Sequence, residues 1–107
     1  MDDFYCDEVF SGKTKVEKVL ETDKVLAFKH TKPHWPVHIV VVPKKHVESL
    51  LEADDDILLA ILHVVQTVAQ DVVAKHGKCQ VLTNLGEYQD SKHLHWHVAS
   101  GKPNHKK

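Results

Sequence analysis

The chain has 107 residues, 42% of them hydrophobic and 27% charged, which suits one soluble domain with its own core and excludes a disordered chain. Its formal net charge is −1 and it contains no arginine, which argues against a nucleic-acid-binding surface. No apolar run approaches the roughly 20 residues of a membrane span, and the N-terminus is acidic where an export signal would be basic. We therefore predict a single cytoplasmic domain over residues 1–107, with a polar tail at 101–107 and no membrane partner.

The first part of the chain predicts three strands. Residues 14–22 ("TKVEKVLET") and 24–30 ("KVLAFKH") alternate apolar and polar side chains around a tight turn, so they predict two antiparallel strands. Residues 31–36 ("TKPHWP") contain two prolines, which exclude a helix or a central strand and predict a loop. Residues 37–43 ("VHIVVVP") are β-branched and predict a buried strand.

The second part predicts a long helix between shorter elements. Residues 44–56 predict a short helix of one or two turns, and residues 55–76 predict the long one, because apolar residues recur there at spacings of three and four. Acidic residues precede this helix and Gly77 follows it, as capping requires. Residues 78–84 predict a strand, 85–91 a loop and 92–99 a final strand. The expected fold is α+β, an antiparallel sheet of about five strands with the long helix on one face.

Three histidines, His93, His95 and His97, stand two residues apart in the predicted final strand. On a strand they would share one face, with successive side chains about 6.5–7 Å apart. The intervening residues 94, 96 and 98 are apolar and would pack on the helix from the other face. Because burying three neighbouring imidazoles in a core is costly, we expect the histidine face to be polar, and either to bind a ligand or to be exposed to solvent.

Spacing alone leaves three interpretations of these histidines open: an incidental or structural pattern, a metal site or a nucleophile. Ten histidines in 107 residues make chance alternation common enough to consider. A metal needs imidazoles converging at about 2.0–2.1 Å, whereas residues i and i+4 on a strand start about 13 Å apart. A nucleophile needs one neutral imidazole with a pKa near 6.5, which predicts activity falling below about pH 6. Flanking histidines would then bind a phosphate that no arginine can hold.

The run "HLHWHVA" at 93–99 resembles the signature of the histidine-triad (HIT) superfamily of nucleotide hydrolases and transferases. Other segments agree with that superfamily in order, namely "VLAFKHTKP", "PVHIVVVPKKHV", Asn84 after a strand and Gln89 four residues before the first triad histidine. The resemblance covers about residues 4–99. It is greatest to the histidine-triad nucleotide-binding proteins, the phosphoramidase branch.

This resemblance implies a HIT-like homodimer that binds purine nucleoside monophosphates or their adducts and needs no cofactor. His95 would attack the α-phosphorus of a nucleoside 5′-phosphoramidate and form a nucleotidyl-histidine that water resolves. His97 would bind the phosphate oxygens, His93 would support the site, and His38 would orient groups or relay protons. A catalytically weak nucleotide-binding module and a dinucleoside polyphosphate hydrolase remain alternatives.

The resemblance also assigns nucleotide contacts, with three departures from the usual pattern, one of which is a loop from Asn84 to Gln89 that is about two residues shorter. Residues matching contact positions are Asn84 and Gln89 near the phosphate and sugar, and Phe28, Tyr5 and Val9 around the base. His30 stands where an aspartate usually binds the ribose hydroxyls. Asp90 replaces a serine that contacts phosphate, and Ser91 is its expected substitute.

A zinc site is a further alternative that the resemblance raises. Some bacterial members hold structural zinc through two N-terminal cysteines, the histidine of "PKKH" and the first triad histidine. The corresponding positions here are Asp3, Cys6, His46 and His93, so one thiolate is missing. Without this metal, Cys6 and Cys79 are expected to be two thiols rather than a disulfide.

Overall fold

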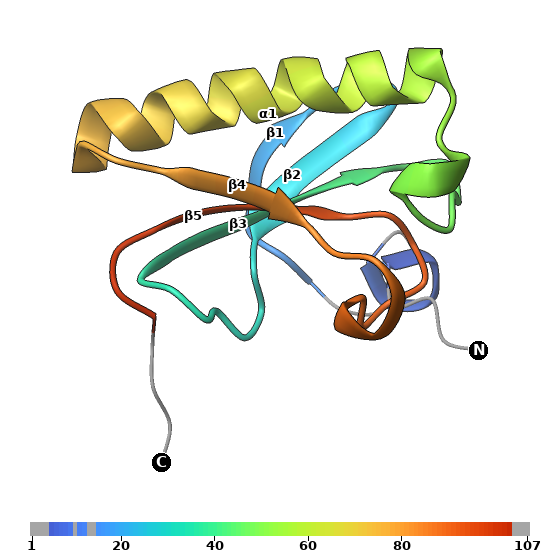
Figure 1. Ribbon diagram of the computed structural model, residues 1–107, viewed down its shortest axis with the longest axis horizontal. Coiled ribbons are helices and arrows are strands. Elements are labelled where there is room, and N and C mark those ends of the chain that lie inside the picture. Colours follow the sequence, from blue (N-terminus) through green and yellow to red (C-terminus); the bar gives the residue numbers. More distant parts are fainter. Residues whose placement is uncertain (1–4, 10, 13–14, 104–107) are drawn as a thin grey trace.

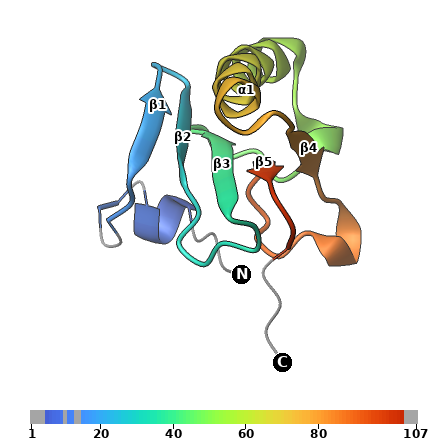
Figure 2. The same ribbon diagram turned by 90° about the vertical axis from the view of Figure 1, so that its left-hand side faces the viewer.

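The structure, a computed structural model, describes residues 5–9, 11–12 and 15–103 and confirms the α+β fold (Figure 1). Five antiparallel strands form one sheet in the order β1-β2-β3-β5-β4. Their bounds are Lys18–Glu21 for β1, Val25–Lys29 for β2, Val37–Pro43 for β3, Gln80–Thr83 for β4 and Trp96–Ser100 for β5. Figure 2 looks along the long helix and shows that it covers one face of the sheet only.

The long helix α1 spans Asp55–His76, the bounds that the sequence predicted. The Asp54 carboxylate accepts a hydrogen bond from the Ile57 N–H at 2.9 Å, and Gly77 ends the helix with a φ of 84°. By length and composition alone α1 could cross a membrane, with a mean hydropathy of 1.8. The core helix of a folded domain meets the same criterion, and α1 packs five buried residues, Ile61, Val64, Val65, Val68 and Val72, against the sheet.

The sheet has a core on each face because strand side chains alternate. Val25 and Ala27 of β2 join the cluster beneath α1, together with alternate residues of β3. Phe28 and Val40 belong to a second, smaller cluster on the opposite face, which the N-terminal helical turn Tyr5–Val9 covers. His38 is in phase with Val40, so β3 directs this histidine to the face that α1 leaves open.

The final strand begins at Trp96, four residues later than predicted, so His93 and His95 lie outside it. The preceding segment is held by long-range contacts instead, because the Leu94 N–H donates to the Val47 carbonyl at 2.7 Å. His93 Nε2 likewise donates to the Pro43 carbonyl at 2.8 Å. Of the three histidines, only His97 is oriented by the side-chain alternation of a strand. Leu94 packs in the core beneath α1 although it lies outside the strand.

Of the two alternatives expected for the histidine face, contact with a ligand or exposure to solvent, the structure excludes solvent exposure. His93, His95 and His97 are 0%, 6% and 8% exposed. Hydrogen bonds to nitrogen atoms of all three rings make this burial tolerable.

The remaining predictions hold in outline. The short helix within residues 44–56 is a single 3₁₀ turn, Leu50–Glu52. The predicted loop 31–36 has no regular structure, and the loop 85–91 contains one 3₁₀ turn at Gly86–Tyr88. Cys6 and Cys79 form no disulfide in the described part of the chain.

Candidate active site

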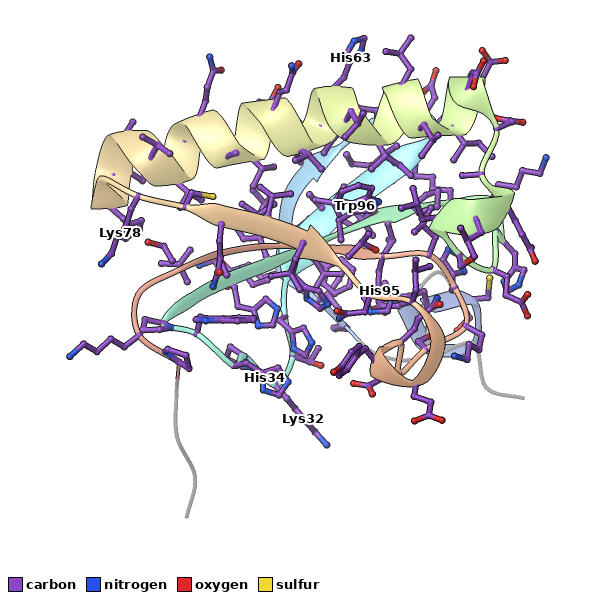
Figure 3. The ribbon with its side chains drawn as sticks, in the orientation of Figure 1. Lys32, His34, His63, Lys78, His95 and Trp96 are labelled. Atoms are coloured by element: carbon purple, nitrogen blue, oxygen red, sulfur yellow. The ribbon has the colours of Figure 1, made fainter. Side chains whose placement is uncertain are left out.

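A cavity of about 410 Å³ opens on the face of the sheet that α1 does not cover. This volume lies within the usual range for small-molecule sites, about 300–1,000 Å³. His95 and His97 both line it, whereas His93 and His38 do not. In Figure 3, Trp96 points toward α1 and His95 lies on the opposite side of the sheet. The irregular segment before β5 and the strand itself thus deliver two imidazoles to one cavity.

His95 is held in the tautomer that a nucleophile needs. Its Nδ1–H donates to the carbonyl oxygen of His93 at 2.8 Å, which leaves the Nε2 lone pair available. The Thr83 hydroxyl donates to the His95 carbonyl at 2.7 Å and ties this backbone to the end of β4. His95 therefore offers an oriented lone pair to the cavity.

His97 is held in the opposite tautomer through His38. The His34 backbone N–H donates to His38 Nδ1 at 3.0 Å, so the proton of the neutral His38 ring is on Nε2. That Nε2–H donates to His97 Nδ1 at 2.8 Å. The His97 proton must then be on Nε2, which makes this atom a hydrogen-bond donor for an anion in the cavity.

Burial keeps these imidazoles neutral. It lowers the pKa of His95, although the hydrogen bond to the His93 carbonyl works in the other direction. Burial, followed by the charges of neighbouring imidazoles, lowers the pKa of His97 to about 4 and that of His38 to about 3. The tautomers assigned above are therefore the states present near neutral pH.

The chain matches the HIT domain family over residues 11–104. It belongs to that family. An uncharacterised HIT-like protein of Chlamydia trachomatis is 32% identical over 99 residues, 89% of each chain. A solved HIT family hydrolase of Legionella pneumophila is 25% identical, with a TM-score of 0.80 over 94% of each chain. A hypothetical histidine triad nucleotide-binding protein of Sulfolobus tokodaii is 31% identical, with a TM-score of 0.80 over 88% of this chain and 66% of its own.

Most of the residues that the sequence predicted to contact a nucleotide line this cavity. The predicted residues that line it are Tyr5, Phe28, His30, Asn84, Asp90 and Ser91. The Ser91 Oγ is buried and has no hydrogen-bond partner among the residues that the structure describes, so it is an orphaned polar atom at the cavity wall. Two predicted residues lie elsewhere, since Gln89 Nε2 donates to the Glu48 carbonyl at 2.7 Å and Val9 packs in the second core.

Sequence reasoning missed the contribution of the loop after β2 to the cavity. Thr31, Lys32, His34 and Trp35, all from the predicted connecting loop, line its wall, and Val40 and Leu82 complete the apolar part. Figure 3 shows Lys32 and His34 on the loop below the sheet. One available signal was that "TKPHWP" carries a histidine and a tryptophan four and three residues before His38.

Three possible metal ligands meet beside the cavity. The ligand atoms of Cys6, His46 and His93 lie within 4.8 Å of one another. His93 Nδ1 is 3.5 Å from the Cys6 sulfur, and its other nitrogen is occupied by Pro43. Thiolate and imidazole are the ligands that zinc prefers, so the described residues fit that ion with three ligands. Asp3, the fourth predicted ligand, lies outside the described residues.

The pH dependence of activity follows from the lowered pKa of His95. A lowered pKa means that the lone pair is lost to protonation only at a lower pH than for a free imidazole, about 6.5. If His95 is the nucleophile of a hydrolase, we expect kcat/KM to be constant from about pH 8 to about pH 6 and to fall below that. Steady-state assays across this range would check it. An acid limb centred at or above about pH 6.5 contradicts the assignment.

Proposed function

We propose that this HIT protein is a nucleotide-binding hydrolase that cleaves purine nucleoside 5′-phosphoramidates through a nucleotidyl intermediate on His95. The observation that carries the proposal is the pair of opposite tautomers facing one cavity. His95 Nε2 offers a lone pair there, and His97 Nε2 offers a proton. The hydrolase from L. pneumophila and the nucleotide-binding protein from S. tokodaii are similar in fold, which supports the same reading.

In the first step His95 Nε2 bonds to the α-phosphorus and the P–N bond to the amine breaks. The amine leaves with a proton taken from water. His97 Nε2–H donates to a phosphate oxygen, whose negative charge is then held without an arginine. In the second step a water oxygen bonds to phosphorus and its proton passes to the hydroxide left by the first step, the His95–phosphorus bond breaks, and the nucleoside monophosphate leaves. The reaction is thereby divided into two displacements at phosphorus, each of which breaks an N–P bond and has a lower barrier than one direct hydrolysis.

The proposal is tested by incubating the protein with adenosine 5′-phosphoramidate and measuring AMP and ammonia. A sample quenched at alkaline pH should carry one added adenylyl group on the peptide that contains His95. Saturable binding of AMP by calorimetry, with no product over hours, would instead support a binding module that has lost turnover. Faster cleavage of a diadenosine polyphosphate would favour the anhydride hydrolase.

We also propose that the protein acts as a homodimer in the cytoplasm. β4 is an edge strand that exposes Val81, and α1 exposes the apolar residues Leu62 and Val73. An edge strand and exposed apolar side chains favour association with a second copy. Sedimentation equilibrium of the purified chain tests the dimer, and a single species of monomer mass contradicts it. Fractionation of the source cells tests the compartment.

A structural zinc site is a second proposal, carried by the convergence of Cys6, His46 and His93. Bound zinc would hold the N-terminal turn against the segment before β5, which would raise the stability of the fold. We expect about one zinc per chain in protein purified without chelators, measured by elemental analysis. Cys6→Ser should lose the metal and lower the melting temperature, and Cys79→Ser, the matched control, should keep both. Equal zinc content in the two variants contradicts this site.

A further inference from the structure

One wall of the cavity presents hydrogen-bond donors and a positive charge. It is formed by the loop that follows β2, and its polar groups come from His30, Thr31, Lys32 and His34. No acidic residue occurs between Asp23 and Glu48 in the sequence. Lys32 is exposed and makes no ion pair with any residue that the structure describes. The wall therefore has an unneutralised ammonium group at the mouth of the cavity.

His30 adds a fixed donor to this wall. The Lys32 backbone N–H donates to His30 Nδ1 at 2.9 Å, so the proton of the neutral ring is on Nε2. The ring stacks on His38 with centroids 4.3 Å apart and planes inclined by 22°, which fixes its orientation. Burial lowers the pKa of His30, so this neutral tautomer persists near neutral pH. A sugar diol is best bound by an acceptor such as a carboxylate, and His30 supplies a donor instead.

The position of this wall relates it to the sugar of a bound nucleotide. The reacting phosphate must lie at His95 and His97, and the His30 ring centroid is 6.2 Å from that of His97. Phe28, two residues earlier on β2, belongs to the apolar part of the same cavity with Tyr5 and Val40. A nucleoside with its base on this apolar part and its 5′-phosphate at the histidines has its sugar between them, next to His30.

We propose that the His30–Lys32 wall binds a second phosphate on the sugar, so that the preferred ligands are nucleoside 2′,5′- or 3′,5′-bisphosphates and their 5′-adducts. This inference rests on the proposed function, because it takes the 5′-phosphate position from His95 and His97. The donors match the many acceptor oxygens of a phosphate, and Lys32 supplies the charge. Asp90, the only carboxylate among the described lining residues, lies on the segment before His93, and its charge acts on His30, so the second phosphate is expected on the Lys32 side of that ring.

The test compares four ligands by titration calorimetry with the full chain: AMP, adenosine 3′,5′-bisphosphate, adenosine 2′,5′-bisphosphate and ADP. We expect one of the bisphosphates to bind about tenfold more tightly than AMP. Lys32→Gln should reduce this ratio to about twofold. Lys78→Gln removes the same charge at an exposed position that lies far from Lys32 and His95 in Figure 3, and it should keep the full ratio. His30→Asp should reverse the preference toward AMP.

Each other outcome counts against the inference in a distinct way. Equal affinity for AMP and both bisphosphates, in protein that hydrolyses adenosine phosphoramidate, overturns the second phosphate site and leaves the proposed function intact. A gain for ADP as large as that for the bisphosphates places the anion on the leaving-group side and overturns the sugar assignment. If Lys32→Gln leaves the ratio of bisphosphate affinity to AMP affinity unchanged, the loop does not bind the second phosphate. Absence of binding by all four ligands overturns both proposals.

Discussion

Replacing His95 with alanine is expected to lower kcat for adenosine 5′-phosphoramidate by about 10⁴-fold or more, the loss typical of removing a covalent nucleophile. The reason is specific to this ring, because no other nitrogen in the described cavity combines a lone pair with a hydrogen bond that aims it. Steady-state assays of AMP release measure the effect. The alkaline-quenched adenylyl adduct should disappear from the same variant.

Two controls separate lost chemistry from lost structure. His95→Ala should still bind AMP within about tenfold of the parent, because the other lining residues remain. His63→Ala changes an exposed histidine on the far side of α1, visible in Figure 3, and should keep full turnover. Circular dichroism melts of both variants report the fold. Turnover of His95→Ala equal to that of the parent would falsify the nucleophile assignment.

Removing the His97 donor is expected to have the second-largest effect, a fall in kcat of about 10²–10³-fold for His97→Ala. The lost interaction is the hydrogen bond from Nε2–H to a phosphate oxygen, which strengthens as charge builds in the transition state. KM should change much less than kcat. His97→Gln retains an amide donor and should recover part of the rate.

His38 tests the hydrogen-bond chain behind His97. It does not line the cavity, and a phenylalanine ring can keep the stacking on His30, so His38→Phe should act chiefly by freeing the orientation and tautomer of His97, at a cost of about 10–100-fold. The double variant with His97→Ala should then be no slower than His97→Ala alone. Additive losses mean that His38 contributes to catalysis independently, and they contradict the relay.

The regular elements were predictable because their signals are local. The bounds of α1 follow from spacing, the Asp54 cap and Gly77, all of which lie within one stretch of sequence. The start of β5 was not predictable, because the Leu94 N–H donates to the Val47 carbonyl, 47 residues earlier in the chain. Nothing near residue 94 signals that this backbone group is already used.

The candidate site divides in the same way. His95 and His97 were predicted as site residues from their own motif, whereas the tautomer of His95 depends on the non-strand backbone at His93, and that of His97 depends on His38 and the His34 N–H, which the fold brings together. Lys32 was missed because a proline-rich loop gives no periodic signal that shows which side chains turn inward. Gln89 matched a contact position in the motif, yet its amide is used to anchor the loop to Glu48.

The irregular backbone before β5 limits how the motif could be engineered. A designer who copied "HLHWH" onto a regular strand would place all three rings on one face, but the His95 ring is aimed by a carbonyl two residues earlier in a non-strand conformation. The transplanted motif would also lack Val47 and Pro43, which anchor that conformation from a separate segment. The smallest transferable unit is therefore a pair of segments, about residues 34–48 and 83–98, in their mutual register.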